Sequence, residues 1–126
     1  MIPFGNEVVT LISRDEYKDE NGRRHARYSA ARLTGCSWKR VARAYLTGDG
    51  VKAYQEETVC RVPYGQPAPK AGDLLIRGEA YERVESAAQF EKLLERYRDG
   101  GGAFTVAAVS DNTRPGLPLR HYAARS

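Results

Sequence analysis

The sequence predicts an α+β fold, mainly an antiparallel β sheet or a small β-barrel built from hairpins, with one covering helix near residues 87–98. Three observations support this prediction. Segments rich in β-branched residues alternate with turn sequences in the first half of the chain. One later segment combines a helical apolar stripe with a capping pattern. A short apolar segment, residues 103–110, follows that helix and is expected to be a strand.

The first half of the chain predicts two hairpins. Asn21-Gly22 is the dipeptide most typical of a tight hairpin turn, because both residues tolerate positive φ. The sequence TGDG at 47–50 marks a second turn. The segment before this turn has apolar residues that would also fit one face of a helix, so its period is ambiguous. The expected strands are residues 8–17, 25–33, 36–46 and 51–62.

In the second half, the Pro/Gly-rich residues 63–72 are expected to form a loop, since no strand or helix interior tolerates that composition. A short hairpin pivoting near Gly78 should follow it. Within this hairpin, alternation places Leu74 and Ile76 on one face and Leu75 on the other. The capping box Ser86-x-x-Gln89 then starts a helix whose core stripe is Phe90, Leu93, Leu94 and Tyr97.

The length of 126 residues predicts a single domain, residues 1–126. Prolines spaced by two residues in RPGLPL stiffen the end of the chain. We therefore expect an extended C-terminal arm from about residue 111 to residue 126. The beginning of the chain has no basic, apolar leader, and no stretch is apolar enough to span a membrane, so the chain is expected to be cytosolic.

Catalytic and metal-binding patterns are not found in the sequence. Nucleophile-elbow, zinc-protease, P-loop and dinucleotide-binding motifs do not occur, so we expect no enzyme activity and no cofactor. The cysteines, Cys36 and Cys60, lie in apolar segments and are expected to be buried thiols, with a disulfide possible if their strands are neighbours. With His25 and His121 they lack the close pairs of a zinc site.

The C-terminal arm is the predicted protein interface. Its apolar residues would be unnecessary in a purely solvated tail, and such arms can add to or wrap over a neighbouring subunit. Tyr64, in the preceding Pro/Gly loop, is a further candidate. The expected interface residues are Tyr64, Arg114, Leu117, Leu119, Arg120 and Tyr122.

Nucleic-acid binding is the alternative hypothesis. The formal net charge is +4, and arginines are interleaved with aromatic residues across residues 23–45. Such a surface on a β-barrel can hold single strands through charge and stacking. The candidate contact residues are Arg23, Arg24, Arg27, Lys39, Arg40 and Arg43.

Several stretches together resemble a family of uncharacterised proteins from tailed phages and prophages. They are MIPFGNEVVTL, LTGCSW, ETVCRVP, PKAGDLLIRGE, AFTVAAVSDNTR and HYAAR. The family is similar in size and strand order to head–tail connector, or head-completion, proteins. This resemblance implies a minor structural protein of the virion, assembled in the host bacterial cytoplasm, that forms an oligomeric ring beside the portal. It brings no catalytic residues, and a tail-terminator protein remains an alternative.

Overall fold

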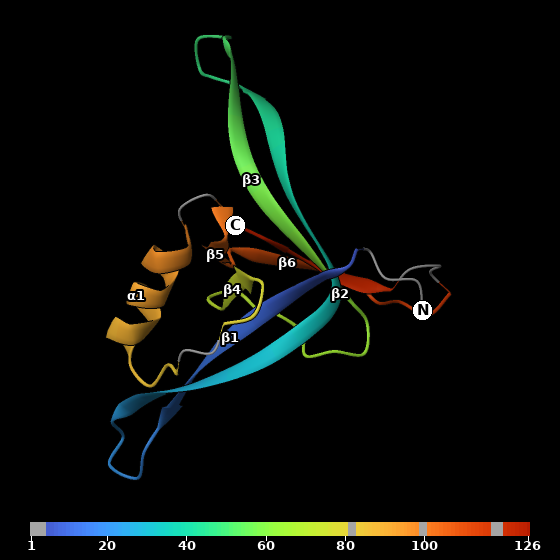
Figure 1. The fold of residues 1–126 in the computed structure, drawn as a ribbon. Coiled ribbons are helices and arrows are strands. Elements are labelled where there is room, and N and C mark those ends of the chain that lie inside the picture. Colours follow the sequence, from blue (N-terminus) through green and yellow to red (C-terminus); the bar gives the residue numbers. More distant parts are fainter. Residues whose placement is uncertain (1–4, 81–82, 99–100, 117–119) are drawn as a thin grey trace.

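Seven strands form one antiparallel sheet in the order β5-β4-β1-β2-β3-β7-β6, with a single helix packed against it (Figure 1). The structure is a computed structural model that describes residues 5–80, 83–98, 101–116 and 120–126, and these counts refer to them. The expected combination of antiparallel sheet and covering helix is confirmed. The elements are β1 (Glu7–Lys18), β2 (Arg24–Leu46), β3 (Lys52–Pro63), β4 (Leu74–Arg77), α1 (Ala87–Arg98), β5 (Ala103–Thr105), β6 (Ala108–Asn112) and β7 (His121–Arg125).

Strand β2 is long and serves both halves of the sheet. Its first part pairs with β1, and its second part pairs with β3. The register against β1 shifts between the pairs Val9–Leu33 and Glu7–Cys36, which marks a bulge in β2. Gly35, with φ +67°, supplies the backbone conformation that this bulge needs. Because of the extra residue, Leu33 and Cys36 both face the core.

The core consists of two clusters of buried hydrophobic residues. One cluster lies between the strands and includes Trp38, whose ring meets Phe104 at a centroid distance of 5.0 Å. The second cluster lies between the sheet and α1. Strand β4 contributes to both, since Leu75 belongs to the first cluster and Leu74 and Ile76 belong to the second. The predicted alternation of β4 is therefore confirmed.

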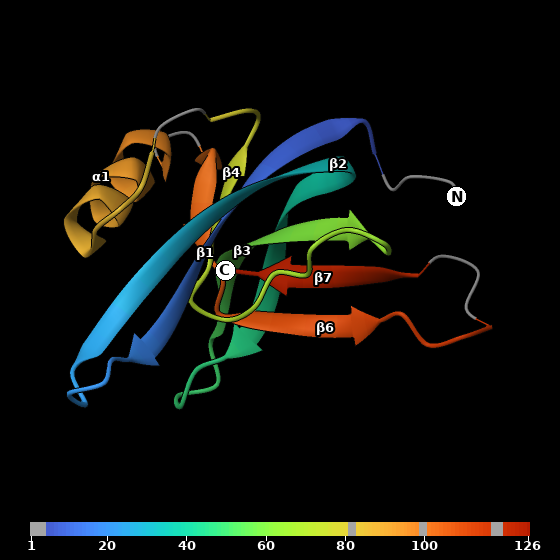
Figure 2. The same ribbon diagram turned by 90° about the horizontal axis from the view of Figure 1, so that it is seen from below.

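The helix begins as its capping sequence predicts. The Gln89 amide donates to Ser86 Oγ at 3.2 Å, and the Gln89 side chain accepts from the Glu85 amide at 2.7 Å. Phe90, Leu93 and Leu94 are buried against the sheet. The helix thus covers the outer face of β1, β4 and β5 (Figure 2).

Both long hairpins end in the same kind of turn. At the β1–β2 tip the Gly22 amide donates to the Asp19 carbonyl, and at the β2–β3 tip the Gly50 amide donates to the Thr47 carbonyl. Each turn has one residue at positive φ, Gly22 in the first and Gly50 in the second. The two-residue turn expected at Asn21-Gly22 is therefore a longer loop, a type I turn closed by a left-handed glycine.

The two edge strands are consecutive in the chain. Only Val106 and Ala107 separate β5 from β6, although β5 pairs with β4 and β6 pairs with β7. The Val106 amide donates to the Asp73 carbonyl at 2.8 Å, and the Ala107 amide donates to the Arg125 carbonyl at 2.8 Å. The chain therefore passes from one end of the sheet order to the other without losing backbone hydrogen bonds.

Part of the segment expected to form an extended C-terminal arm belongs to the sheet. Residues 111 and 112 are the end of β6, and residues 121–125 form β7, which lies between β3 and β6. Ala123 and Ala124 are buried there. The arm prediction is wrong for these two strands because the backbone of the segment pairs on both sides of β7, which sequence composition does not reveal.

The hairpin expected around Gly78 is also not formed in the described residues. Gly78 has φ +96° and turns the chain, but β4 pairs with β1 and β5. Beyond the turn, the buried Thr10 hydroxyl donates to the Gly78 carbonyl at 2.8 Å and accepts from the Ala80 amide at 3.0 Å. These bonds direct the chain toward α1 instead of back along β4.

Candidate interaction surfaces

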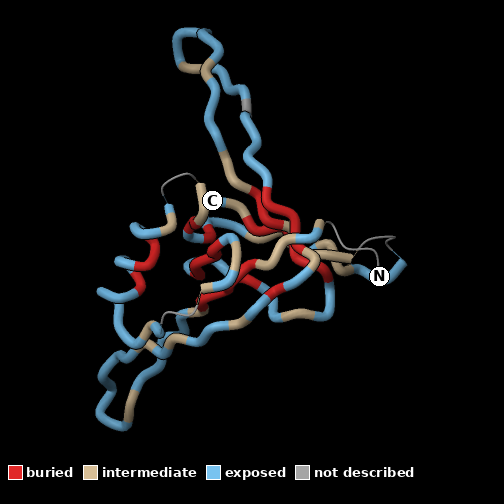
Figure 3. The backbone as a smooth tube through the Cα atoms, in the orientation of Figure 1, coloured by how far each residue is buried: buried red, intermediate tan, exposed pale blue. Residues whose placement is uncertain are grey.

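The outer part of the β2–β3 hairpin projects from the body of the protein as a two-stranded ribbon (Figure 1). We define this ribbon as residues 40–57. Its root is held by the buried residues Trp38 and Cys60, which face each other across the pair. Beyond the root, both strands become exposed along most of their length (Figure 3).

Large apolar side chains are exposed along this ribbon. Leu46 and Tyr54 are each 70% exposed, the highest values among the large hydrophobic residues described. The register pairs Leu46 with Lys52 and Ala44 with Tyr54, so these four residues share one face. Tyr45 lies on the opposite face. The exposed apolar residues of the ribbon are Val41, Tyr45, Leu46, Val51 and Tyr54.

The tip of the ribbon is held by its own turn. The Thr47 hydroxyl donates to Asp49, and the Thr47 amide donates to the Val51 carbonyl at 2.9 Å. Hydrogen bonds from the Thr47 hydroxyl and from the Val51 amide lower the pKa of Asp49. The tip therefore presents a carboxylate between two apolar residues, Leu46 and Val51.

Sequence reasoning missed this apolar ribbon. The local signal was present, because apolar residues flank the turn TGDG on both sides in AYL-TGDG-VKAY. Its meaning depends on where the neighbouring strands stop. Pairing of β1 with β2 reaches only Cys36, and pairing of β7 with β3 begins at Val59. Only this non-local information identifies the ribbon as exposed on both edges.

The predicted interface residues are not gathered on one arm. Tyr64 and Arg120 contact each other, with the Arg120 guanidinium 4.1 Å from the centre of the Tyr64 ring. The backbone supports this contact, since the Tyr64 amide donates to the Arg120 carbonyl at 2.9 Å. Tyr122 is in β7 and packs partly against the core. Arg114 is exposed, whereas Leu117 and Leu119 lie outside the described residues.

The candidate nucleic-acid residues fall into two separate groups. Arg23, Arg24 and Arg27 belong to the β1–β2 hairpin, which projects in a different direction from the ribbon (Figure 1). There Arg27 lies 5.1 Å from the centre of the Tyr17 ring, which stacks on His25. The second group is on β2 beyond its bulge and consists of Lys39, Arg40 and Arg43.

The members of the second group do not form one surface. Lys39 and Arg40 are consecutive residues of a strand, so their side chains leave opposite faces. Arg40 also packs on the backbone of Gly101, where an added Cβ would lie 1.8 Å from the guanidinium. Arg43 pairs with Gln55 in the ladder, and its side chain lies outside the described part of the structure. The structure therefore separates the six candidates.

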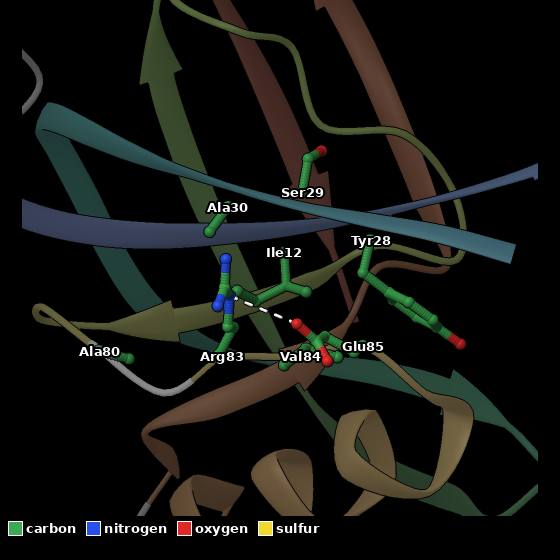
Figure 4. A pocket seen from close by; sticks show the side chains of 8 residues that line it. All are labelled: Ile12, Tyr28, Ser29, Ala30, Ala80, Arg83, Val84 and Glu85. Carbon is green, nitrogen blue, oxygen red and sulfur yellow. Dashed lines mark ion pairs between the residues drawn. The ribbon is translucent and has the colours of Figure 1, made fainter.

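A cavity of about 560 Å³ lies between β1, β2 and the segment that leads into α1 (Figure 4). Its apolar lining includes Ile12, Ala30 and Val84. Arg83 and Glu85 form an ion pair at 3.4 Å beside it. Tyr28 also lines the cavity, and its buried hydroxyl has no hydrogen-bond partner within the part of the chain that the structure describes. The cavity thus combines an apolar lining with one charge of each sign.

The cysteines are buried free thiols, as expected. Cys60 lies opposite Trp38, and both cysteines belong to the same core cluster. A hydrogen bond with Cys36 and burial raise the pKa of Cys60. Among the described residues, no group of three or more histidine, cysteine or acidic side chains is placed to hold a metal ion. No helix in that same part of the chain is long and apolar enough to cross a membrane.

Together, these features define an antiparallel β protein with one covering helix and an exposed apolar ribbon. The chain belongs to DUF6751, a family of unknown function, whose model matches residues 4–125. Neither the curated proteins nor the solved structures include a match to the chain.

Proposed function

We propose that this protein is an assembly protein of phage or prophage virions, of the head–tail connector or head-closure type. It acts by packing against other subunits and not by catalysis. The observation that carries the proposal is the exposed apolar ribbon between β2 and β3. The resemblance of the sequence to connector proteins supplies the virion context.

The ribbon supports an assembly role because its apolar side chains stay in contact with water in a free monomer, which is unfavourable in free energy. Tyr45, Leu46 and Tyr54 leave apolar area in water on both faces. Clusters of this kind on a soluble protein commonly mark contacts with other proteins. The free edges of the ribbon strands carry charged residues such as Arg40 and Glu56, which discourage unspecific strand addition. The ribbon is therefore suited to a specific contact.

We also propose that β5 and β6 act as one bent strand that closes the sheet into a small barrel. The hydrogen bonds of Val106 and Ala107 to residues on either side support this closure. The main core cluster supports it as well, since β1, β2, β3, β4, β5 and β7 all contribute to it. A barrel would be a rigid base for the ribbon.

In this proposal the partners are other copies of the chain and the portal or tail proteins of the virion. A subunit that uses different surfaces on its two sides makes heterologous contacts, which close into a ring when the rotation permits. A tail-terminator protein would use the same ring packing but contact the tail tube. Association with a purified portal ring, compared with a purified tail tube, distinguishes these positions.

The double variant Tyr45→Ser/Tyr54→Ser tests the assembly role. Light scattering after size exclusion should give an oligomer for the unaltered protein, alone or with the portal protein of the same phage genome. The variant should lose that association. Tyr17→Ser is the matched control, because Tyr17 is an exposed tyrosine on the other projecting hairpin. Equal association of all three proteins would overturn the proposal.

Nucleic-acid binding is a second candidate function, favoured by one observation. Arg27 lies against the ring of Tyr17, which stacks on His25, and Arg23 and Arg24 lie nearer the tip of the same β1–β2 hairpin. Charge contacts to phosphates should weaken steeply as salt increases. Fluorescence anisotropy with a labelled single strand, at several salt concentrations, tests this function. Unchanged binding after replacement of the three arginines by glutamine would exclude this hairpin as the contact.

A further inference from the structure

We propose that the ribbon tip of one copy docks into the cavity beside α1 of a second copy. This inference rests on the proposed assembly function and names the two surfaces that meet. The ribbon tip is defined here as residues 46–54, and the receiving cavity is the one lined by Ile12, Ala30 and Val84.

The ribbon tip presents a compact apolar projection. Leu46 and Lys52 are directly paired, and Tyr54 lies diagonally from Leu46 on the same face. Leu46 and Tyr54 are each 70% exposed, so the described part of the chain leaves both side chains largely uncovered. The ribbon end is two strands wide and is closed by hydrogen bonds from the Thr47 amide to the Val51 carbonyl and from the Gly50 amide to the Thr47 carbonyl, so it is narrow. A narrow end with two large apolar side chains can enter a cavity that a broad surface could not.

The receiving cavity has the opposite shape and a matching lining. Its volume of about 560 Å³ is ample for the leucine and part of the tyrosine of a neighbouring ribbon. Ile12 and Ala30 are direct partners in the β1–β2 ladder and form an apolar floor. Tyr28 also lines this site, while its hydroxyl is buried and has no hydrogen-bond partner among the described residues.

The charges of the two surfaces are complementary. The ribbon tip has one anion and one cation, Asp49 and Lys52. The cavity has Arg83 and Glu85, which bond to each other in the free protein. On docking, Lys52 can approach Glu85 while Asp49 approaches Arg83, so no charge is left without a partner. This pairing would fix the orientation of the tip as well as its position.

A chain cannot fill its own cavity with its own ribbon. The ribbon projects from one side of the body, and the cavity lies near the start of α1 on the other side (Figure 1). The contact is therefore heterologous, with each copy offering a tip to one neighbour and a cavity to the other. Successive contacts of this kind would build a ring or a filament.

A mixing experiment tests this arrangement. Leu46→Ser/Tyr54→Ser removes the tip, and Ala30→Arg fills the cavity from an exposed position of β2. Each variant alone should be a monomer by light scattering, while the unaltered protein forms larger species. An equimolar mixture should form a one-to-one dimer and nothing larger, because one intact tip and one intact cavity remain. Ala108→Arg, at an exposed position of β6 that belongs to neither surface, is the control and should assemble normally.

The possible outcomes separate this inference from the assembly function. If the tip variant is monomeric but Ala30→Arg assembles normally, the ribbon still mediates assembly and docking in the cavity is wrong. An unaltered protein that stays monomeric at about millimolar concentration would overturn self-docking, and portal binding would then test the assembly role separately.

Disulfide trapping gives a second measurement that does not depend on stable oligomers. Leu46→Cys and Ala30→Cys proteins are mixed and oxidised, with the native cysteines buried. A mixed disulfide between the two proteins is expected. If Leu46→Cys links only to itself, the ribbons meet each other and the inference is wrong.

Discussion

Asp73 illustrates how one buried charge can organise distant parts of the chain. Its carboxylate is fully buried and accepts from the Lys70 amide at 3.0 Å and from Lys70 Nζ at 3.1 Å. Lys70 also pairs with Asp15 of β1 at 3.0 Å. The Asp73 carbonyl accepts from Val106. The residue thus joins the Pro/Gly loop, β1 and the crossing between β5 and β6.

Replacing Asp73 by asparagine should destabilise the protein by about 1–3 kcal/mol, because the Lys70 amide and the Lys70 ammonium would lose the charged acceptor to which they donate. The free energy of unfolding from urea denaturation measures the effect. Asp15→Asn is the matched control, since Asp15 contacts the same ammonium but is largely exposed. Its effect should stay within about 0.5 kcal/mol. Equal losses for the two variants would contradict a structural role of the buried carboxylate.

Asp19 makes the β1–β2 turn sensitive to acid. A hydrogen bond with His25 at 2.6 Å, followed by one from the Arg23 amide, lowers the pKa of Asp19 from its ordinary value of 3.8. Because the folded pKa is lowered, the stabilisation is present above pH 3.8 and is lost as the pH falls through the folded value. A carbon NMR titration of the carboxyl should find this lower pKa. His25→Gln should raise it toward 3.8, and an unchanged titration would show that His25 is not the cause.

At the scale of single elements, α1 was predictable because its signals are local. Ser86, Gln89 and the apolar stripe lie within a few turns of one another and act without the rest of the fold. Strand β4 was predictable only in part. Its alternation was apparent from Leu74, Leu75 and Ile76. Its pairing with β1 was not, since it joins distant parts of the chain; the nearby bonds of Thr10 with Gly78 and Ala80 join residues 68 and 70 positions apart.

The helix cap gives a prediction at this scale. Ser86→Ala should reduce stability by about 1 kcal/mol, because the Gln89 amide loses its acceptor at the start of α1. Thermal unfolding followed by circular dichroism measures the change. Ser29→Ala, an exposed serine of β2, serves as the control and should have little effect. Equal unfolding midpoints for Ser86→Ala and the unaltered protein would mean that the cap does not stabilise the helix.

The ribbon is an element that the sequence predicted only in part. The strands on either side of TGDG were expected, and the ambiguity of residues 36–46 is resolved as strand because β2 pairs with β3 from Ser37 to Leu46. Its projection was not expected. A ribbon becomes free where the neighbouring strands end, and β1 and β7 are set by parts of the chain far from the turn.

At the scale of the whole molecule, the end of the chain determines how the sheet is completed. Strand β7 pairs with β3 from Val59–Arg125 to Pro63–His121. On its other side it pairs with β6 from Ala108–Arg125 to Asn112–His121. The small buried residues Ala123 and Ala124 fit this inner position. Composition favoured an arm because prolines and basic residues surround the segment. The pairing of β7 with β3 depends on residues about 60 positions earlier in the chain. No local sequence pattern reveals a partner at that distance.

A chain that ends at Arg120 should therefore fail to fold, and not merely lose an arm. Removal of β7 would leave β3 and β6 without their shared partner and would expose the main core cluster. We expect loss of the cooperative thermal transition and of dispersed amide signals in NMR spectra. Removing only Ser126 is the control. Ser126 exchanges two hydrogen bonds with Thr58, so its loss should cost about 1–3 kcal/mol and leave the fold intact. A folded shorter chain with an unchanged midpoint would mean that residues 121–125 are an arm after all, because a strand paired on both sides cannot be removed without loss of stability.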